Sequence, residues 1–219
     1  VNVSVTTSGG ASEPVGLQGA AADDFLYYAV TPTVTSLAPS TGGSAGGTSV
    51  VITGTGFVTG STVAFGALAA TSVVVDSATQ ITAVSPATTA LSTVDVQVTT
   101  TAGSTSTSGT EDDFTFQAAT PTVTGLSTTT GPVTGGTSVT ISGTGFITGS
   151  TVTFGLVAGS SVIVDSPTQL RVTAPASVVV GKVDVTVTSG AFTSAASGAA
   201  NDYTYSATTP VVTGMTPLT

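Results

Sequence analysis

Three short acidic stretches contain the residues of this sequence that are best suited to chemistry. Each directly precedes an aromatic residue, and together they comprise Asp23 and Asp24; Glu111, Asp112 and Asp113; and Asn201 and Asp202. Ca²⁺ binds several oxygen ligands, including carboxylate and amide oxygens, so these stretches are candidate calcium sites. They lack the alternating ligand spacing of an EF-hand loop, and the third stretch has one carboxylate. A water-exposed acidic turn is therefore the default interpretation, with bound calcium as the alternative and no other cofactor expected.

Catalytic residues are scarce. The chain has no His and no Cys, and its only Lys is Lys182. General acid–base catalysis relies most often on His, and a serine nucleophile needs an adjacent base. Asp76 and Asp95 could form the carboxylate pair of a hydrolase, but both recur as Asp165 and Asp184. Duplicated strand or turn residues explain them more simply, so we expect no enzyme activity.

The charge balance excludes several partners. The chain carries two basic and eleven acidic residues, for a net charge of −9. Nucleic-acid binding needs clustered Lys and Arg to contact phosphates, and anionic membrane surfaces also attract basic segments. No apolar run approaches the roughly 20 residues that span a bilayer. We expect neither nucleic-acid binding nor membrane insertion in this segment.

An internal repeat determines which elements position the acidic residues. The stretch 46–66 recurs almost unchanged as 135–155, an offset of 89 residues, and residues 1–5 match 94–98 at an offset of 93. The repeat predicts four units: the end of a preceding repeat at 1–30, full repeats at 31–119 and 120–208, and the start of another at 209–219. Because both ends fall inside a repeat, we expect the same polypeptide to continue in both directions.

Each full repeat predicts about seven short strands and no helix. Val94, Val96 and Val98 alternate with polar residues, which is typical of a strand with one buried face. Phe114 and Phe116 form a second inward pair. In the first full repeat, the expected strands lie near 33–37, 48–53, 62–65, 71–75, 80–84, 93–99 and 113–117. Many short strands at this spacing, separated by Gly, Ser, Pro or Asp, indicate an all-β sandwich.

The repeat resembles the IPT/TIG family (immunoglobulin-like, plexins, transcription factors). The resemblance rests on Pro32, Gly46-Gly47-Thr48, Gly54-Thr55-Gly56-Phe57, Val63-Ala64-Phe65-Gly66, Pro86, the Val-x-Val-x-Val stretch at 94–98 and the closing Asp-Phe-x-Phe at 113–116. It implies tandem immunoglobulin-like β-sandwiches, as in bacterial cell-surface repeat proteins. Family members also occur in receptor ectodomains, as accessory modules of polysaccharide-degrading enzymes and in DNA-binding factors, so the fold leaves function open.

Two functions fit these observations. The first is a structural segment of a long extracellular or cell-surface protein, bacterial in origin, whose repeats form a stalk, fibre or filament. Its partners are further repeats of the same chain, and homotypic assembly into filaments is a second expectation. The alternative is an adhesin or carbohydrate-binding accessory module. Only four residues separate Phe116 from Pro121, and proline fixes φ, so the joint between repeats is expected to be stiff.

Overall fold

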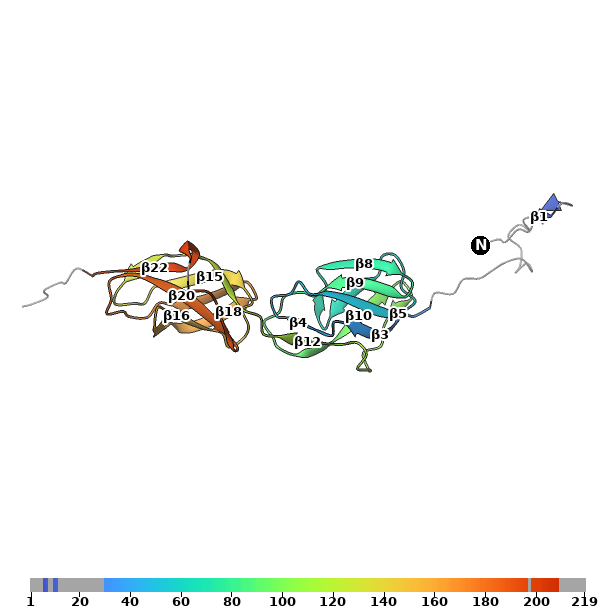
Figure 1. The fold of residues 1–219 in the computed structure, drawn as a ribbon, viewed down its shortest axis with the longest axis horizontal. Coiled ribbons are helices and arrows are strands. Elements are labelled where there is room, and N and C mark those ends of the chain that lie inside the picture. Colours follow the sequence, from blue (N-terminus) through green and yellow to red (C-terminus); the bar gives the residue numbers. More distant parts are fainter. Residues whose placement is uncertain (1–5, 8–9, 12–29, 197, 209–219) are drawn as a thin grey trace, which may run out of the picture.

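The computed structural model describes residues 6–7, 10–11, 30–196 and 198–208. Within these ranges the chain forms two β-sandwiches that lie end to end along the long axis of the molecule (Figure 1). The one helix among the described residues is a single 3-10 turn, η1 (Ala199–Asn201). No described helix has the length and apolar character needed to cross a membrane. The predicted all-β fold of tandem immunoglobulin-like sandwiches is confirmed.

The first sandwich consists of two sheets. One has the order β3-β5-β9-β8, and the other has the order β4-β12-β10-β6-β7, with β11 paired to β10. Their bounds are β3 (Thr33–Ala38), β4 (Thr41–Gly43), β5 (Ser49–Thr55), β6 (Thr62–Phe65), β7 (Leu68–Ala69), β8 (Ser72–Ser77), β9 (Gln80–Val84), β10 (Thr93–Thr100), β11 (Gly103–Ser104) and β12 (Asp113–Gln117). All described pairings in this sandwich are antiparallel except that of β4 with β12, which is parallel.

The second sandwich repeats this arrangement strand for strand. Its sheets have the orders β13-β15-β19-β18 and β14-β22-β20-β16-β17, with β21 paired to β20. Their bounds are β13 (Thr122–Leu126), β14 (Thr130–Pro132), β15 (Ser138–Thr144), β16 (Thr151–Phe154), β17 (Val157–Ala158), β18 (Ser160–Ser166), β19 (Gln169–Thr173), β20 (Gly181–Ser189), β21 (Phe192–Thr193) and β22 (Asp202–Ser206). The shared topology follows from the near-identical apolar pattern, because strand register is set by which residues face the core.

Each sandwich encloses its own core, with three packed aromatic rings. In the first, the ring centroids of Phe65 and Phe114 lie 5.0 Å apart, and those of Phe114 and Phe116 lie 5.1 Å apart, both in edge-to-face geometry. In the second sandwich, Phe154, Tyr203 and Tyr205 form the same cluster. Edge-to-face pairs add about 0.5–1.5 kcal/mol beyond the burial of their area. Phe114 and Phe116 are both buried in this core, which confirms their expected inward orientation.

The preceding unit is described only at one strand pair. β1 (Thr6–Thr7) pairs with β2 (Gly10–Ala11) in antiparallel register, Thr6 opposite Ala11. β10 and β11 make the equivalent pair 93 residues later, with Thr99 opposite Ser104. This pairing agrees with the offset of 93 residues seen in the sequence. The rest of 1–29 and all of 209–219 lie outside the described residues.

Candidate cation site

Three carboxylates come together where β10 and β12 lie side by side. Asp95 pairs directly with Asp113 across the two antiparallel strands, and Asp112 precedes Asp113. One carboxylate oxygen from each of these three residues lies within 4.8 Å of the other two. The pairing of β10 with β12 thus brings Asp95 next to Asp112 and Asp113, which are distant from it in sequence.

Asp112 differs from the other two in its burial. Its side chain continues the inward row of Phe114 and Phe116, two residues apart along the strand, and only 3% of the residue is exposed. Its Oδ2 atom is buried and has no hydrogen-bond partner among the described residues. Burial raises the pKa of this carboxyl above 3.8, and the negative charges of Asp95, Asp113 and Glu111 raise it further. The expectation of a water-exposed turn therefore does not hold for Asp112.

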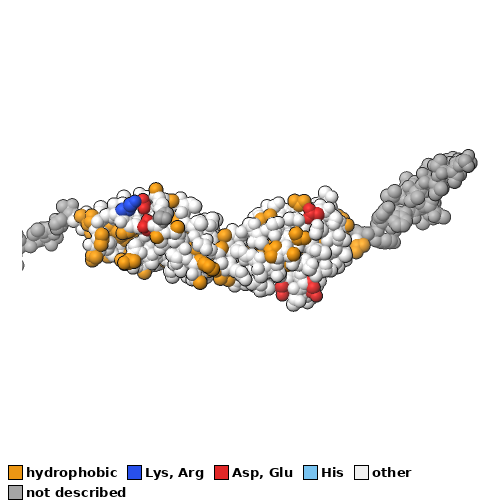
Figure 2. Space-filling model, viewed as in Figure 1, with side chains coloured by type: hydrophobic (Ala, Val, Ile, Leu, Met, Phe, Trp, Pro, Cys, Tyr) orange, Lys and Arg blue, Asp and Glu red, His pale blue; other side chains and the backbone are white. Residues whose placement is uncertain are grey.

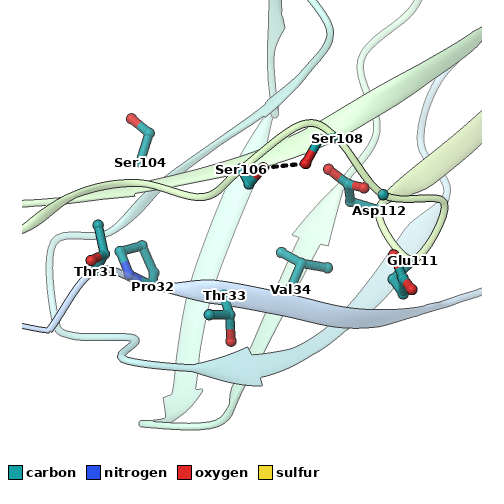
Figure 3. A pocket seen from close by; sticks show the side chains of 10 residues that line it. Thr31, Pro32, Thr33, Val34, Ser104, Ser106, Ser108, Glu111 and Asp112 are labelled. Carbon is teal, nitrogen blue, oxygen red and sulfur yellow. Dashed lines mark hydrogen bonds between the residues drawn. The ribbon is translucent and has the colours of Figure 1, made fainter.

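An open hollow of about 530 Å³ lies beside Asp112. Its wall comprises the start of β3, including Thr33 and Val34, and the loop 104–112 that leads into β12. Figure 3 shows Asp112 at the end of this loop, near Ser108, with Ser106 and Ser108 joined by a hydrogen bond of 2.7 Å. The hollow is lined by apolar groups together with hydroxyl and carboxylate groups, and Asp112 is part of its wall.

The second repeat has an amide at the equivalent position. Asn201 is also buried, and its Nδ2 donates hydrogen bonds to the carbonyl oxygens of Val185 at 3.2 Å and Ala195 at 3.3 Å. One nearby backbone hydrogen bond is shared by both repeats, although Asn201 ends the 3-10 turn η1 and Asp112 does not. Val98 N donates to Thr105 Oγ1 at 3.1 Å, and Val187 N donates to Ser194 Oγ at 3.0 Å. An ionised Asp112 has no hydrogen to donate, so it cannot reproduce the bonds made by Asn201.

The remaining predicted candidates lie apart from this cluster. Glu111 is exposed, and its Oε2 accepts a hydrogen bond from Thr110 N at 3.0 Å. Asp202 is paired with Lys182, whose Nζ lies 2.9 Å from Asp202 Oδ2. Asp23 and Asp24 lie outside the described residues. Charged side chains form only a few isolated spots on the visible surface (Figure 2).

Asp95 is the member of the cluster that was absent from the predicted cation ligands. For Asp112, a sequence signal exists: extending the inward period of Phe114 and Phe116 back by two residues reaches it. The pairing of Asp95 with Asp113 depends on the register between β10 and β12, which no local pattern specifies. Asp76 and Asp165, the other predicted acidic positions, instead bond across β8–β9 and β18–β19 to Thr82 and Arg171.

Comparison with protein families gives two matches to one domain. The IPT/TIG domain model matches residues 32–117 and 121–205, which confirms the resemblance seen in the sequence. The comparison with curated proteins gives no match.

Several solved structures are similar to parts of the chain. The plexin A4 extracellular region is 25% identical over 80% of this chain and 18% of that one, with a TM-score of 0.38. SGBP-B from a complex xyloglucan utilization locus in Bacteroides uniformis is 20% identical over 75% of this chain and 48% of that one, with a TM-score of 0.34. Yersinia pseudotuberculosis InvD is 19% identical over 87% and 62%, with a TM-score of 0.38. The chain spans less than a fifth of the plexin chain.

Proposed function

This chain belongs to the IPT/TIG domain family. We propose that it is a structural segment of an extracellular, cell-surface repeat protein of bacterial origin. Its sandwiches stack end to end as a stalk or fibre and carry no catalytic role. The observation that supports this most strongly is the joint between the two repeats, which is packed and hydrogen-bonded.

The joint is closed by contacts from both repeats and from the linker. Thr148 N in the second repeat donates a 2.8 Å hydrogen bond to Thr89 O in the first. Ile147, beside it, is only 4% exposed. In the linker, Ala119 N donates to Ser44 Oγ at 3.3 Å, which fastens the linker to the first repeat. These contacts favour a fixed angle between the repeats.

The outer ends of the pair carry the two halves of the same joint. Val58, the counterpart of Ile147, is 45% exposed and borders an open hollow lined also by Phe57 and Ala102. At the opposite end, Val178 is the counterpart of Thr89 and is fully exposed among the described residues. Val58 and Val178 are thus exposed at positions whose counterparts lie at the joint, where Ile147 is buried and Thr89 is half-buried. A further repeat of the same chain fits this pattern, and so does head-to-tail contact between copies in a filament.

Solution scattering of the chain and two matched variants tests the proposal. Ile147→Asp places a charge in the joint, whereas Val58→Asp places the same charge at the equivalent, exposed position. We expect the wild type and Val58→Asp to share one maximum dimension, and Ile147→Asp to show a broader range of inter-repeat distances. Equal flexibility in all three proteins would contradict a stiff stalk.

The alternative of a carbohydrate-binding module has less support. Sugar-binding surfaces usually present exposed aromatic rings. Among residues 30–196 and 198–208, Phe192 is the one exposed aromatic side chain, and the chain has no Trp. The sequence also predicts that Tyr28 points outward or into the joint, and it lies outside the described residues. Binding on a glycan array that Phe192→Ser abolishes would favour the adhesive function over the structural one.

A further inference from the structure

We propose that Asp95, Asp112 and Asp113 form a Ca²⁺ site that is present in the first repeat and absent from the second. The carboxylates supply three oxygen ligands. The carbonyl oxygens of Val96 and Ser106, the counterparts of those that Asn201 engages, complete the protein part of the site. Water from the adjoining hollow fills the remaining positions.

The buried Oδ2 atom of Asp112 points to a ligand. A buried polar atom without a partner costs about 1–3 kcal/mol, and native structures seldom leave one unexplained. One oxygen of the same carboxylate also lies within 4.8 Å of an oxygen of Asp95 and of Asp113, and like charges at this separation repel. A divalent cation satisfies the unpartnered oxygen and removes the repulsion together.

The second repeat is a natural comparison for this site. Asn201 replaces the buried carboxylate, and its amide hydrogens satisfy the carbonyl oxygens of Val185 and Ala195 directly. Lys182 Nζ lies 2.9 Å from Asp202 Oδ2 and provides a positive charge, where the first repeat has Thr93. In the second repeat, the Lys182 ammonium and the Asn201 amide thus provide the positive charge and the hydrogen-bond donors that we assign to a bound cation in the first repeat.

The donor set selects Ca²⁺ among the common metals. All the ligands are oxygens, and the chain has no His or Cys, which zinc and copper sites prefer. Mg²⁺ demands near-ideal octahedral geometry and gives up its water reluctantly, whereas Ca²⁺ accepts irregular sets of six to eight oxygens. Extracellular Ca²⁺ modules have dissociation constants of about 10⁻⁴–10⁻³ M, and we expect this range.

Titration calorimetry with CaCl₂ on the chelator-treated chain tests the proposal. We expect one Ca²⁺ per chain and, at millimolar Ca²⁺, a rise of several degrees in the Tm of the first repeat. Asp112→Asn should weaken binding at least tenfold. This variant is expected to fold, because Asn occupies the equivalent position in the second repeat.

Glu111→Gln is the matched control. The substitution removes one negative charge from Glu111, an exposed residue next to Asp112 that is not part of the cluster. It should leave the affinity within twofold of the wild type. The proposal is overturned if Ca²⁺ changes neither heat nor Tm. Equal weakening by Asp112→Asn and Glu111→Gln would also overturn it, because that result means diffuse attraction to an acidic chain.

Discussion

At the scale of single residues, the two repeats have side chains of different charge or hydrogen-bonding capacity at a few equivalent positions. Asp112 and Asn201 have nearly the same shape and the same burial, yet only the amide can donate to the neighbouring carbonyl oxygens. Thr82 and Arg171 show a second exchange. Thr82 Oγ1 donates to Asp76 at 2.8 Å, and Arg171 Nε donates to Asp165 at the same distance. The equivalent aspartates Asp76 and Asp165 thus each accept a hydrogen bond, from a neutral donor in the first repeat and from a positively charged donor in the second.

The Arg171–Asp165 pair predicts a measurable pH dependence. The hydrogen bonds and charge of Arg171 hold the pKa of Asp165 below 3.8. A lowered folded-state pKa stabilises the protein above the unfolded value, and this contribution is lost as the pH falls through the folded value. Arg171→Thr, which copies Thr82, should therefore reduce the loss of Tm between about pH 4 and pH 2. The effect should be small, because the pair is exposed and screened by salt.

Thermal unfolding at several pH values provides the measurement, with Thr82→Ser as a neutral control on the first repeat. A variant whose acid sensitivity equals that of the wild type would show that the ion pair is not coupled to folding.

At the scale of the elements, alternation and turn residues predict the longer strands well. The expected strands at 62–65, 80–84 and 113–117 coincide with β6, β9 and β12. The short strand β4 was missed, because Thr41-Gly42-Gly43 has no alternation and little β propensity. Its pairing with β12 is a long-range contact, and only the assembled sandwich specifies it.

Close backbone approach at Gly143 predicts a strong sequence requirement in β15. A Cβ atom there would overlap the carbonyl oxygen of Thr122 and lie 2.6 Å from the ring of Phe146. Gly143→Ala must therefore separate β13 from β15 or displace the ring, at a cost of about 1–3 kcal/mol or more. Gly125→Ala in the neighbouring strand is the control, since a Cβ there meets nothing within 4 Å. Chemical denaturation should show a stability loss in the first variant alone.

At the scale of the whole molecule, the repeat offset predicts two like sandwiches, but it cannot predict how they meet. Val58 and Ile147 have similar side chains in near-identical surroundings, so the sequence assigns them the same environment. Only the packing of the second repeat against the first buries Ile147 and leaves Val58 exposed. The joint is thus a property of the assembled pair.

The apolar end of the second repeat predicts weak self-association. Val178, Val179 and Val180 are all exposed, where the first repeat has Thr89, Ala90 and Leu91. Val178→Thr with Val179→Ala should lower dye binding to apolar surface and reduce concentration-dependent light scattering, with little change in Tm. Ile163→Thr removes an exposed apolar side chain from β18 instead, and it should leave both signals unchanged. Equal reductions by the two changes would contradict a docking surface at this end.

The parallel pairing of β4 with β12 and of β14 with β22 also governs how each repeat responds to tension. Ser44 N donates to Gln117 O at 2.7 Å and Thr115 N to Ser40 O at 2.9 Å, and the second repeat makes the matching bonds. Because these strands run the same way, a pull that draws the start and the end of a repeat apart slides one strand along the other. Several hydrogen bonds must then shear at once instead of opening singly. The hydrogen bonds between these parallel strands are therefore loaded in shear when the start and the end of a repeat are pulled apart.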